Sequence, residues 1–417
     1  MESSASAIDL IRRRSVAGFL TATVLSTTAL ICQVTALGKL VYDLTGRELD
    51  IGWLGLAEFL PVALLVTVAG SAADRFDRRV VVRLGWAGEA AATGALGALV
   101  ATENVTLARI LALVVLFGVA RAFANPAGRS LPANIVERHE LPRLAALFSL
   151  SWQAAMILGP ILAGLLYAID PMWPFVVSTA LLGSAVVAMT TVRTHQVLAP
   201  ATATGEGRLH QAIEGLRVIR RRPILLGAIS LDLFAVLFGG AVALLPVLAE
   251  QRLGVGAVGF GWLRAAGGIG AALTAGVLAL RPIRRRVGTT LFVAVAIFGV
   301  GTIALGVTRN YVVAFVSMLV LSGADAVSVF VRSTLGPLVV PDELRGRVAA
   351  VESVFIGASN ELGGFESGLV GQWIGAPAAV VAGGVCTLAV VGTGLVVFGP
   401  LRRVDRFEDL RSDGLSA

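Results

Sequence analysis

The chain has 417 residues, of which 56% are apolar and only 15% are charged. Its mean hydropathy is +0.84, whereas soluble domains carry charge on about a quarter of their residues. This composition excludes an ordinary water-soluble protein, and a lipid bilayer is the solvent that it fits. The net charge of +7 therefore needs an explanation other than nucleic-acid binding.

Apolar stretches of about 20 residues, the length that crosses a bilayer as a helix, recur along the whole chain. They predict twelve membrane spans, at 16–42, 51–73, 80–100, 105–125, 143–168, 173–192, 223–249, 255–280, 288–308, 311–334, 347–374 and 376–399. The first stretch is too long for a signal peptide, so we expect it to remain in the mature protein. The sequence thus predicts an all-α membrane protein.

The basic residues give an independent test of these spans, because Lys and Arg gather in cytoplasmic loops. Most of the 34 basic residues fall in segments that the twelve spans place on one side. The loops on the other side contain only Arg47, Arg252 and Arg309. We therefore expect a multi-pass protein of the bacterial inner membrane with both termini in the cytoplasm, and we interpret the positive charge as a topology signal.

A charged segment between the second and third predicted spans recurs 206 residues later in the chain. The matched pairs are Gly70 with Gly276, Arg75 with Arg281, Arg78 with Arg284 and Arg79 with Arg285. The acid Asp74 is not repeated, since Leu280 stands in its place. A second match, at an offset of 204, pairs Gly159 with Gly363. These matches indicate a duplicated half with room for six spans, as in many secondary transporters.

The repeat predicts two six-helix bundles, 1–192 and 223–399, joined by a cytoplasmic linker at 193–222. A tail at 400–417 follows, and we expect it to be poorly ordered because it is short and polar. Within the linker, apolar residues at helical spacing predict an amphipathic helix on the inner membrane surface, with arginines opposite them. The apolar positions are Leu209, Ile213, Leu216 and Ile219.

Several kinds of chemistry find no support in the sequence. Cys32 and Cys386 lie in predicted spans, and the three histidines lie in predicted inner loops, so we expect no metal and no cofactor. The Gly-Lys-Ser/Thr motif of a phosphate-binding loop is absent. We therefore expect no enzyme activity, and transport would have to draw on an ion gradient or on the gradient of the substrate itself.

Ionisable groups inside membrane spans are costly, which makes each of them a functional hypothesis. The candidates for coupling or for a substrate cavity are Glu58, Glu89, Asp232, Asp325, Glu361 and Arg264. Glu352, Arg109, Arg121 and Arg332 also fall within predicted spans. Glu58 and Arg264 occupy equivalent positions in the two halves, so they could face each other, either as a coupling device or as a permanent structural pair.

In the fifth predicted span, Gly159 and Pro160 are adjacent. A small residue lets helices approach closely, and proline in a membrane helix favours a kink. Generic helix packing and a gating role explain this pair about equally well.

The segment from Gly70 to Arg79 resembles the hinge signature of the major facilitator superfamily, whose usual form is Gly-x-x-x-Asp-Arg-x-Gly-Arg-Arg. The chain departs from it at Asp77, where Gly is usual. Gly159-Pro160 resembles the antiporter signature of that superfamily, although Ala155 replaces its first Gly. Two later segments, 341–348 and 359–364, are similar to the enterobactin-exporter-like branch, also called transmembrane secretion effectors, which includes siderophore exporters and macrolide efflux pumps.

The resemblance implies alternating access, in which two six-helix bundles rock about a central site. It also implies that Asp74, with Arg75, Arg78, Arg79 and the hinge glycine Gly70, forms an inner charge latch that stabilises the outward-facing state. In this superfamily the hinge acid lies near the start of the eleventh helix, where a carboxylate is electrostatically favourable, and this agrees with the latch role of Asp74.

We therefore expect a proton-coupled exporter of a siderophore or an amphipathic drug. Its partners would be the small-molecule substrate, protons and the lipid bilayer, with no nucleic acid, and it would be a monomer. An uptake symporter of the same fold is the first alternative, and a membrane sensor or scaffold that transports nothing is the second.

Overall fold

The computed structural model describes residues 7–194, 208–240, 242–341 and 344–412. The central part of the expected linker, 195–207, lies outside the described residues, as do two residues of the 341–348 motif. In the described part all regular elements are helical, as expected. By internal contacts the chain forms two compact units. The first contains the described residues of Met1–Gly46, Leu56–Ala203 and Gly256–Ala265, and the second contains those of Arg47–Gly55, Thr204–Val255 and Ala266–Ala417.

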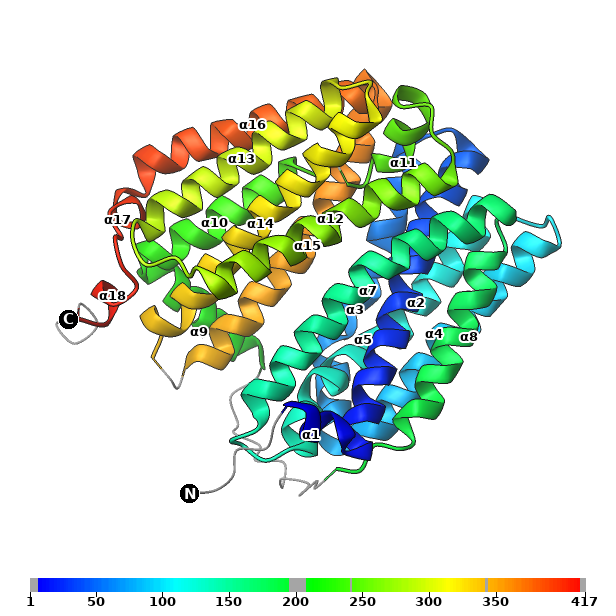
Figure 1. Cartoon of the computed structure of the whole chain (residues 1–417), viewed down its shortest axis with the longest axis horizontal. Coiled ribbons are helices and arrows are strands. Elements are labelled where there is room, and N and C mark those ends of the chain that lie inside the picture. The colour runs from blue at the N-terminus through cyan, green and yellow to red at the C-terminus, as the bar shows by residue number, and fades with distance from the viewer. Residues whose placement is uncertain (1–6, 195–207, 241, 342–343, 413–417) are drawn as a thin grey trace. The chain divides into compact units, whose positions relative to one another are not determined.

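Six long helices make up the first half of the chain (Figure 1). They are α2 (Arg14–Thr45), α3 (Glu48–Arg75), α4 (Arg78–Ala101), α5 (Leu107–Ser130), α7 (Leu141–Ile169) and α8 (Trp173–Met189). Two short helices, α1 (Ala7–Arg12) and α6 (Pro132–Ile135), accompany them. Each long helix coincides with a predicted span, with ends that differ by a few residues.

The second half repeats this order after α9 (Arg208–Arg221). Its long helices are α10 (Pro223–Phe238), α12 (Ala257–Leu280), α13 (Val287–Val307), α14 (Tyr311–Val339), α15 (Arg345–Ile374) and α16 (Ala376–Val397). The short elements are α11 (Leu245–Val247), the π-helical turn η1 (Leu248–Arg252), α17 (Gly399–Arg402) and α18 (Asp409–Ser412).

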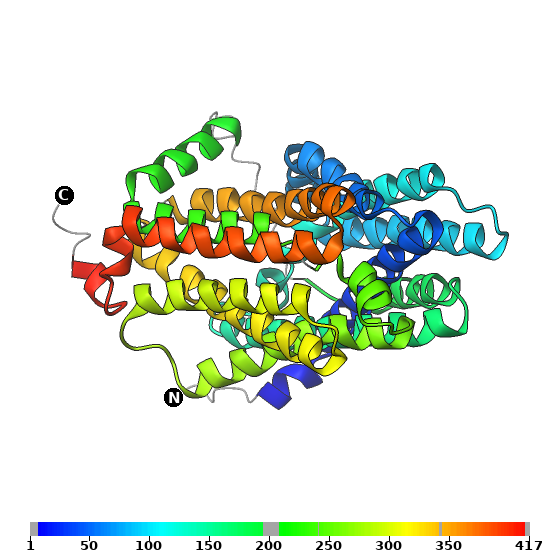
Figure 2. The ribbon, with the colours of Figure 1, turned by 90° about the horizontal axis from the view of Figure 1, so that it is seen from above.

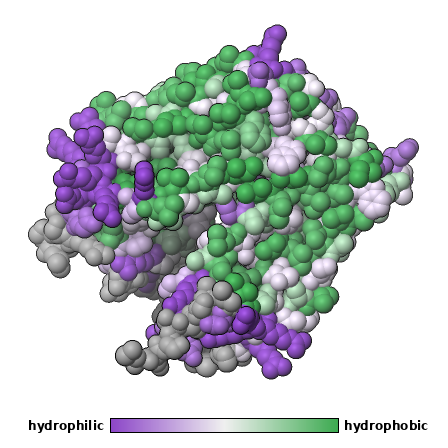
Figure 3. Space-filling model, in the orientation of Figure 1, coloured by the Kyte–Doolittle hydropathy of each residue, from purple (hydrophilic) through white to green (hydrophobic). Residues whose placement is uncertain are grey.

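Eight helices in the described part are long and apolar enough to cross a membrane: α2, α3, α5, α7, α12, α13, α14 and α16. α8 and α10 are apolar but shorter. α4 and α15 are long but carry more charge, including Glu89 in α4 and Glu361 in α15. Figure 3 shows broad hydrophobic surface over the helices, with hydrophilic residues gathered near their ends. The protein is therefore a multi-pass membrane protein.

The seventh predicted span, 223–249, is wrong as a single helix. α10 ends at Phe238, and the chain resumes helical structure only at Leu245. A Cβ at Gly239 would lie 2.5 Å from the Phe298 ring, and one at Gly240 would lie 2.5 Å from the carbonyl oxygen of Gly363. Glycine is favoured at such close approaches and is a poor helix former, which explains the interruption. The hydropathy pattern does not reveal it because both segments are apolar.

The pattern of neighbouring helices is the same in the two halves. The first helix of each half contacts the fifth and sixth, since α2 packs on α7 and α8, and α10 packs on α15 and α16. The third helix contacts the fourth and sixth, since α4 packs on α5 and α8, and α13 packs on α14 and α16. This correspondence agrees with the duplication that the sequence indicates.

Gly159 allows α7 to approach α2 closely. A Cβ at this position would lie 2.7 Å from the Ile31 Cβ and 3.2 Å from the Cys32 backbone nitrogen. Pro160 is buried, and α7 continues through it as one helix. The close approach agrees with the packing interpretation of Gly159, and a gating role of the Gly159-Pro160 pair stays a prediction.

Contrary to the expectation of a poorly ordered tail, the described part of the segment after α16 packs against the second unit, while residues 413–417 lie outside the described residues. Leu401, Val404 and Leu410 are buried in a core cluster of the second unit. The same segment caps α13, since the backbone N–H of Arg286 donates to Asp405 Oδ1 at 3.0 Å and that of Val287 donates to the Asp405 carbonyl at 3.1 Å. The first N–H groups of a helix lack intrahelical partners, so these contacts satisfy them.

We predict that Asp405→Ala destabilises the second unit. Loss of a side-chain acceptor at a helix start costs about 1 kcal/mol, so the thermal unfolding temperature in detergent should fall. Glu408→Ala is the matched control, because Glu408 is an exposed acid in the same segment. Equal melting temperatures for the two variants would contradict a capping role.

Candidate functional site

The hinge between α3 and α4 is built around Asp77, the residue that departs from the superfamily signature. α3 ends at Arg75 and α4 begins at Arg78, which puts Asp77 at the N-cap of α4. Its Oδ1 accepts the backbone N–H of Arg79 at 2.9 Å, and its Oδ2 accepts the Arg79 guanidinium at 2.6 Å. Asp is among the best N-cap residues, and its charge is favourable at a helix N-terminus.

Two arginines fasten this hinge to the rest of the first unit. Arg78 donates to Asn134 Oδ1 in α6 at 2.6 Å, and Arg79 donates to the Val192 carbonyl at 3.3 Å, just beyond α8. The hydrogen bonds from Arg79 lower the pKa of Asp77 below its usual value. Asp77 therefore remains ionised at neutral pH and holds Arg79 in place.

The remaining predicted latch residues lie at the end of α3. Asp74 and Arg75 have exposed side chains, and Gly70 is half-buried. Arg78 and Arg79 thus have structural partners inside the first unit, while Asp74 and Arg75 lie on its surface. The latch role of Asp74 stays a prediction.

Glu58 of α3 forms an ion pair with Arg121 of α5. Both side chains are largely buried, at 19% and 24% exposure, so the pair neutralises two charges within the membrane region. The sequence suggested Arg264 as the partner of Glu58 and did not anticipate Arg121. Arg264 is half-buried in α12, and a contact between Arg264 and Glu58, whether for coupling or for structure, stays a prediction.

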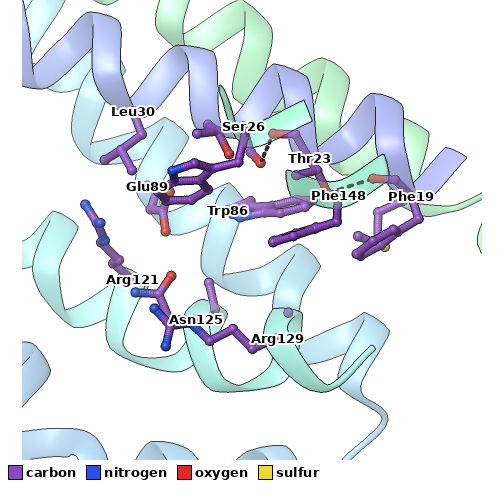
Figure 4. Close-up of a pocket in the computed structure, with 15 residues that line it drawn as sticks. Phe19, Thr23, Ser26, Leu30, Trp86, Glu89, Arg121, Asn125, Arg129 and Phe148 are labelled. Carbon is purple, nitrogen blue, oxygen red and sulfur yellow. Dashed lines mark hydrogen bonds between the residues drawn. The ribbon is translucent and has the colours of Figure 1, made fainter. Parts of the chain in front are cut away.

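Glu89 of α4 is 5% exposed and lines a cavity of about 120 Å³. Figure 4 shows Glu89, Arg121 and Asn125 around this cavity, with the rings of Trp86 and Phe148 beside them. A carboxylate, a guanidinium and an amide thus face the same space, together with aromatic rings. The residues that line the cavity are contributed by helices α2, α4, α5, α7 and α8.

The size of this cavity limits what it can hold. A water molecule occupies about 30 Å³ in the liquid, whereas drug-sized ligands occupy pockets of roughly 300–1,000 Å³. The cavity therefore fits a few water molecules around Glu89 and is too small for a drug-sized compound in this conformation.

The second unit has its own buried charge cluster, in which Arg332 of α14 lies between two acids. Arg332 Nη2 is 2.8 Å from Asp232 Oδ1 in α10, and Nη1 is 3.6 Å from Glu352 Oε1 in α15. Ser328 donates to Asp232 Oδ1 at 3.4 Å. Arg332 is only 6% exposed, and its Nε is buried with no hydrogen-bond partner among the described residues. The cluster links three helices through one guanidinium.

Asp325 is on the same helix face as this cluster. It precedes Ser328 by three residues and Arg332 by seven, which is the spacing of one face of α14. With Asp232 and Glu352, it gives three carboxyl groups near a single guanidinium, so the cluster has excess negative charge when all are ionised. Glu361, further along α15, is half-buried.

Sequence reasoning missed several of these partners. Arg121, Arg332 and Glu352 were recognised as charges within spans, but nothing in the sequence says which groups they meet. Asp77 did carry a readable signal, because Asp is a typical N-cap residue and Asp77 lies within three residues of the predicted span 80–100. Nothing in the sequence indicated that Trp86 and Asn125 line a cavity beside Glu89.

We predict that Arg332→Gln strongly destabilises the protein, because it leaves buried carboxylates without their cation. Removing one partner of a buried ion pair costs about 3–5 kcal/mol, which should appear as a large fall in the thermal unfolding temperature. The exposed Arg309→Gln is the matched control. Combining Arg332→Gln with Asp232→Asn should restore part of the lost stability, and additive losses would contradict direct pairing.

Comparisons with known proteins agree with the sequence repeat and the helical architecture. The family model described as Major Facilitator Superfamily matches residues 19–364. The MFS-type transporter YfiS of Bacillus subtilis is 27% identical over 374 residues, which cover 84% of this chain and 85% of that protein. The multidrug efflux pump Tap of Mycobacterium tuberculosis is 26% identical over 385 residues, with coverages of 87% and 88%.

The fold has a close match among solved structures. A bacterial homologue of the human lysosomal transporter Spinster superposes with a TM-score of 0.70 at 15% identity, covering 96% of this chain and 98% of that one. At this identity the match shows the fold alone. Together with the family match over most of the chain, the evidence identifies this protein as a member of the Major Facilitator Superfamily of membrane transporters.

Proposed function

We propose that the protein is a secondary active exporter that moves a small amphipathic compound out of a bacterial cell in exchange for protons. Its similarity to the multidrug efflux pump Tap supports a drug as substrate, and the segments similar to siderophore exporters support a siderophore. The clustering of arginines in alternate loops supports insertion in the inner membrane with both termini in the cytoplasm. We propose a monomer as the working unit.

The observation that carries proton coupling is the buried carboxyl group of Glu89 in a cavity of water-like size. A proton can reach Glu89 through a few water molecules, while a drug-sized substrate cannot enter this space. Arg121 lines the same cavity and already pairs with Glu58. In this proposal Glu89 accepts and releases the transported proton, and the substrate occupies a different space that opens during alternating access.

The second unit offers a further proton-sensitive contact. Protonation of Asp232 or Glu352 would remove one of the two attractions that hold Arg332. Because these groups join α10, α14 and α15, such a change would alter the packing of three helices at once. We propose that this cluster links proton binding to helix movement.

The primary test is proton release from the purified protein in detergent while siderophores and lipophilic cationic drugs are added one at a time. We expect one compound to release protons from the wild type, and Glu89→Gln to bind that compound with little or no release. Glu103→Gln, which changes an exposed acid, should behave like the wild type. Undiminished release from Glu89→Gln would contradict the role of Glu89.

The direction of transport requires a separate measurement in inside-out vesicles. Accumulation of the compound when the vesicle interior is acidified supports export. Accumulation only with the opposite gradient would instead support an uptake symporter of the same fold. A compound that binds without moving under either gradient would favour a sensor or scaffold.

We also predict that Asp74→Asn impairs transport without lowering the thermal unfolding temperature. Asp74 is exposed at the end of α3, so its replacement leaves the core of the first unit intact while removing the charge of the proposed latch. Reconstituted Asp74→Asn should transport more slowly than Glu103→Gln. Full transport by Asp74→Asn would exclude the latch role.

A further inference from the structure

One side of the helix α9 packs against other helices of the second unit. Ile219 is 1% exposed and packs in a cluster with Leu225, Val348 and Val351. A Cβ at Gly215 would lie 2.7 Å from the Arg347 carbonyl oxygen, so α9 and the first turn of α15 are in backbone contact. Glu214 forms an ion pair with Arg347 at the same place. α9 is therefore firmly attached to the start of α15.

The apolar stripe of α9 extends beyond this attachment. Ile213 is 47% exposed and Leu216 is 46% exposed. At 100° per residue, Ile213 points away from Gly215 and Ile219, while Leu216 lies between Ile213 and Ile219, at the edge of the covered face. Figure 2 shows α9 along the outside of the second unit, beside α10 and the start of α15. The second unit thus covers only part of the apolar stripe.

The charge around the exposed part of the stripe is positive. Arg217, Arg220 and Arg221 are exposed, and the acid among the described side chains of α9, Glu214, is already paired with Arg347. Apolar side chains flanked by arginines are the composition of helices that lie in the headgroup layer of a membrane. An acidic soluble protein would match the arginines but would give no reason for Ile213 and Leu216.

The position of α9 agrees with a membrane partner. Its last residue, Arg221, is followed by Arg222 and then by Pro223, the first residue of the apolar helix α10. The end of α9 therefore lies where the chain enters the bilayer.

We propose that the exposed face of α9, formed by Ile213, Leu216, Arg217 and Arg220, binds the anionic phospholipid surface of the membrane. Ile213 and Leu216 insert among the headgroups, and the arginines contact lipid phosphates. Because α9 is attached to Arg347, this binding fixes the first turns of α15, which also carries Glu352 of the buried charge cluster. Anionic lipid therefore stabilises the second unit, whatever compound is transported and in whichever direction.

The first test uses the full-length protein in lipid nanodiscs of phosphatidylcholine with increasing phosphatidylglycerol. We expect phosphatidylglycerol to raise the thermal unfolding temperature of the wild type. The triple variant Arg217→Gln/Arg220→Gln/Arg221→Gln should respond much more weakly, because each arginine adds attraction to an anionic surface. The phosphatidylglycerol content that gives half of the rise in unfolding temperature should increase at least about tenfold, or the rise should disappear. The matched control, Arg281→Gln/Arg284→Gln/Arg402→Gln, removes three exposed arginines elsewhere in the second unit. An equal loss in both triple variants would overturn the proposal.

A second measurement reports the location of α9 directly. Leu216→Cys, in a Cys32→Ala/Cys386→Ala background, is labelled with an environment-sensitive fluorophore in the same nanodiscs. We expect blue-shifted emission with phosphatidylglycerol and not with phosphatidylcholine alone. Emission typical of water in both would exclude membrane docking, even if a stability change occurred. Soluble glycerol phosphate should produce neither effect, and an equal stabilisation by it would point to a free phosphate site instead.

Discussion

The high cost of placing charge inside a bilayer governs this structure. A charged group in a membrane span is tolerated when it pairs with another charge or faces water. Both solutions occur here, since Glu58 pairs with Arg121 while Glu89 lines a small cavity. In the second unit, Arg332 contacts Asp232 and Glu352. These contacts determine how the helices that carry them pack. Protonation of a carboxylate in one of these ion pairs would weaken the same contact.

The two halves share one helix arrangement but stabilise it differently. In the first half, Asp77 caps α4 from the adjacent loop and also holds Arg79. In the second half, the corresponding loop lacks an acid, and the segment after α16 supplies Asp405 to the start of α13. A helix start needs acceptors for its first N–H groups, whichever segment provides them. The duplicated architecture is therefore conserved between the halves while its local supports have diverged.

The small volume around Glu89 separates two tasks that a transporter must perform. Space for a few water molecules suits proton access, while substrate binding requires a much larger opening. Family membership establishes transport as the general activity, and the cavity around Glu89 is too small to show which compound is transported. Lipid contact at α9 would also act on the buried charge cluster of the second unit, because α9 is joined to α15, the helix that contributes Glu352.

The sequence by itself determined the number, order and approximate ends of the long helices, because a membrane helix satisfies its backbone hydrogen bonds locally and its apolar length is readable from hydropathy. It also identified most of the charges within the spans. Only the tertiary structure decided that α10 stops at Phe238, that the segment carrying Leu401 and Leu410 is buried, and that Glu58 meets Arg121. These features depend on which faces of distant helices come together. Such contacts join residues far apart in the chain, so no local pattern of residues specifies them.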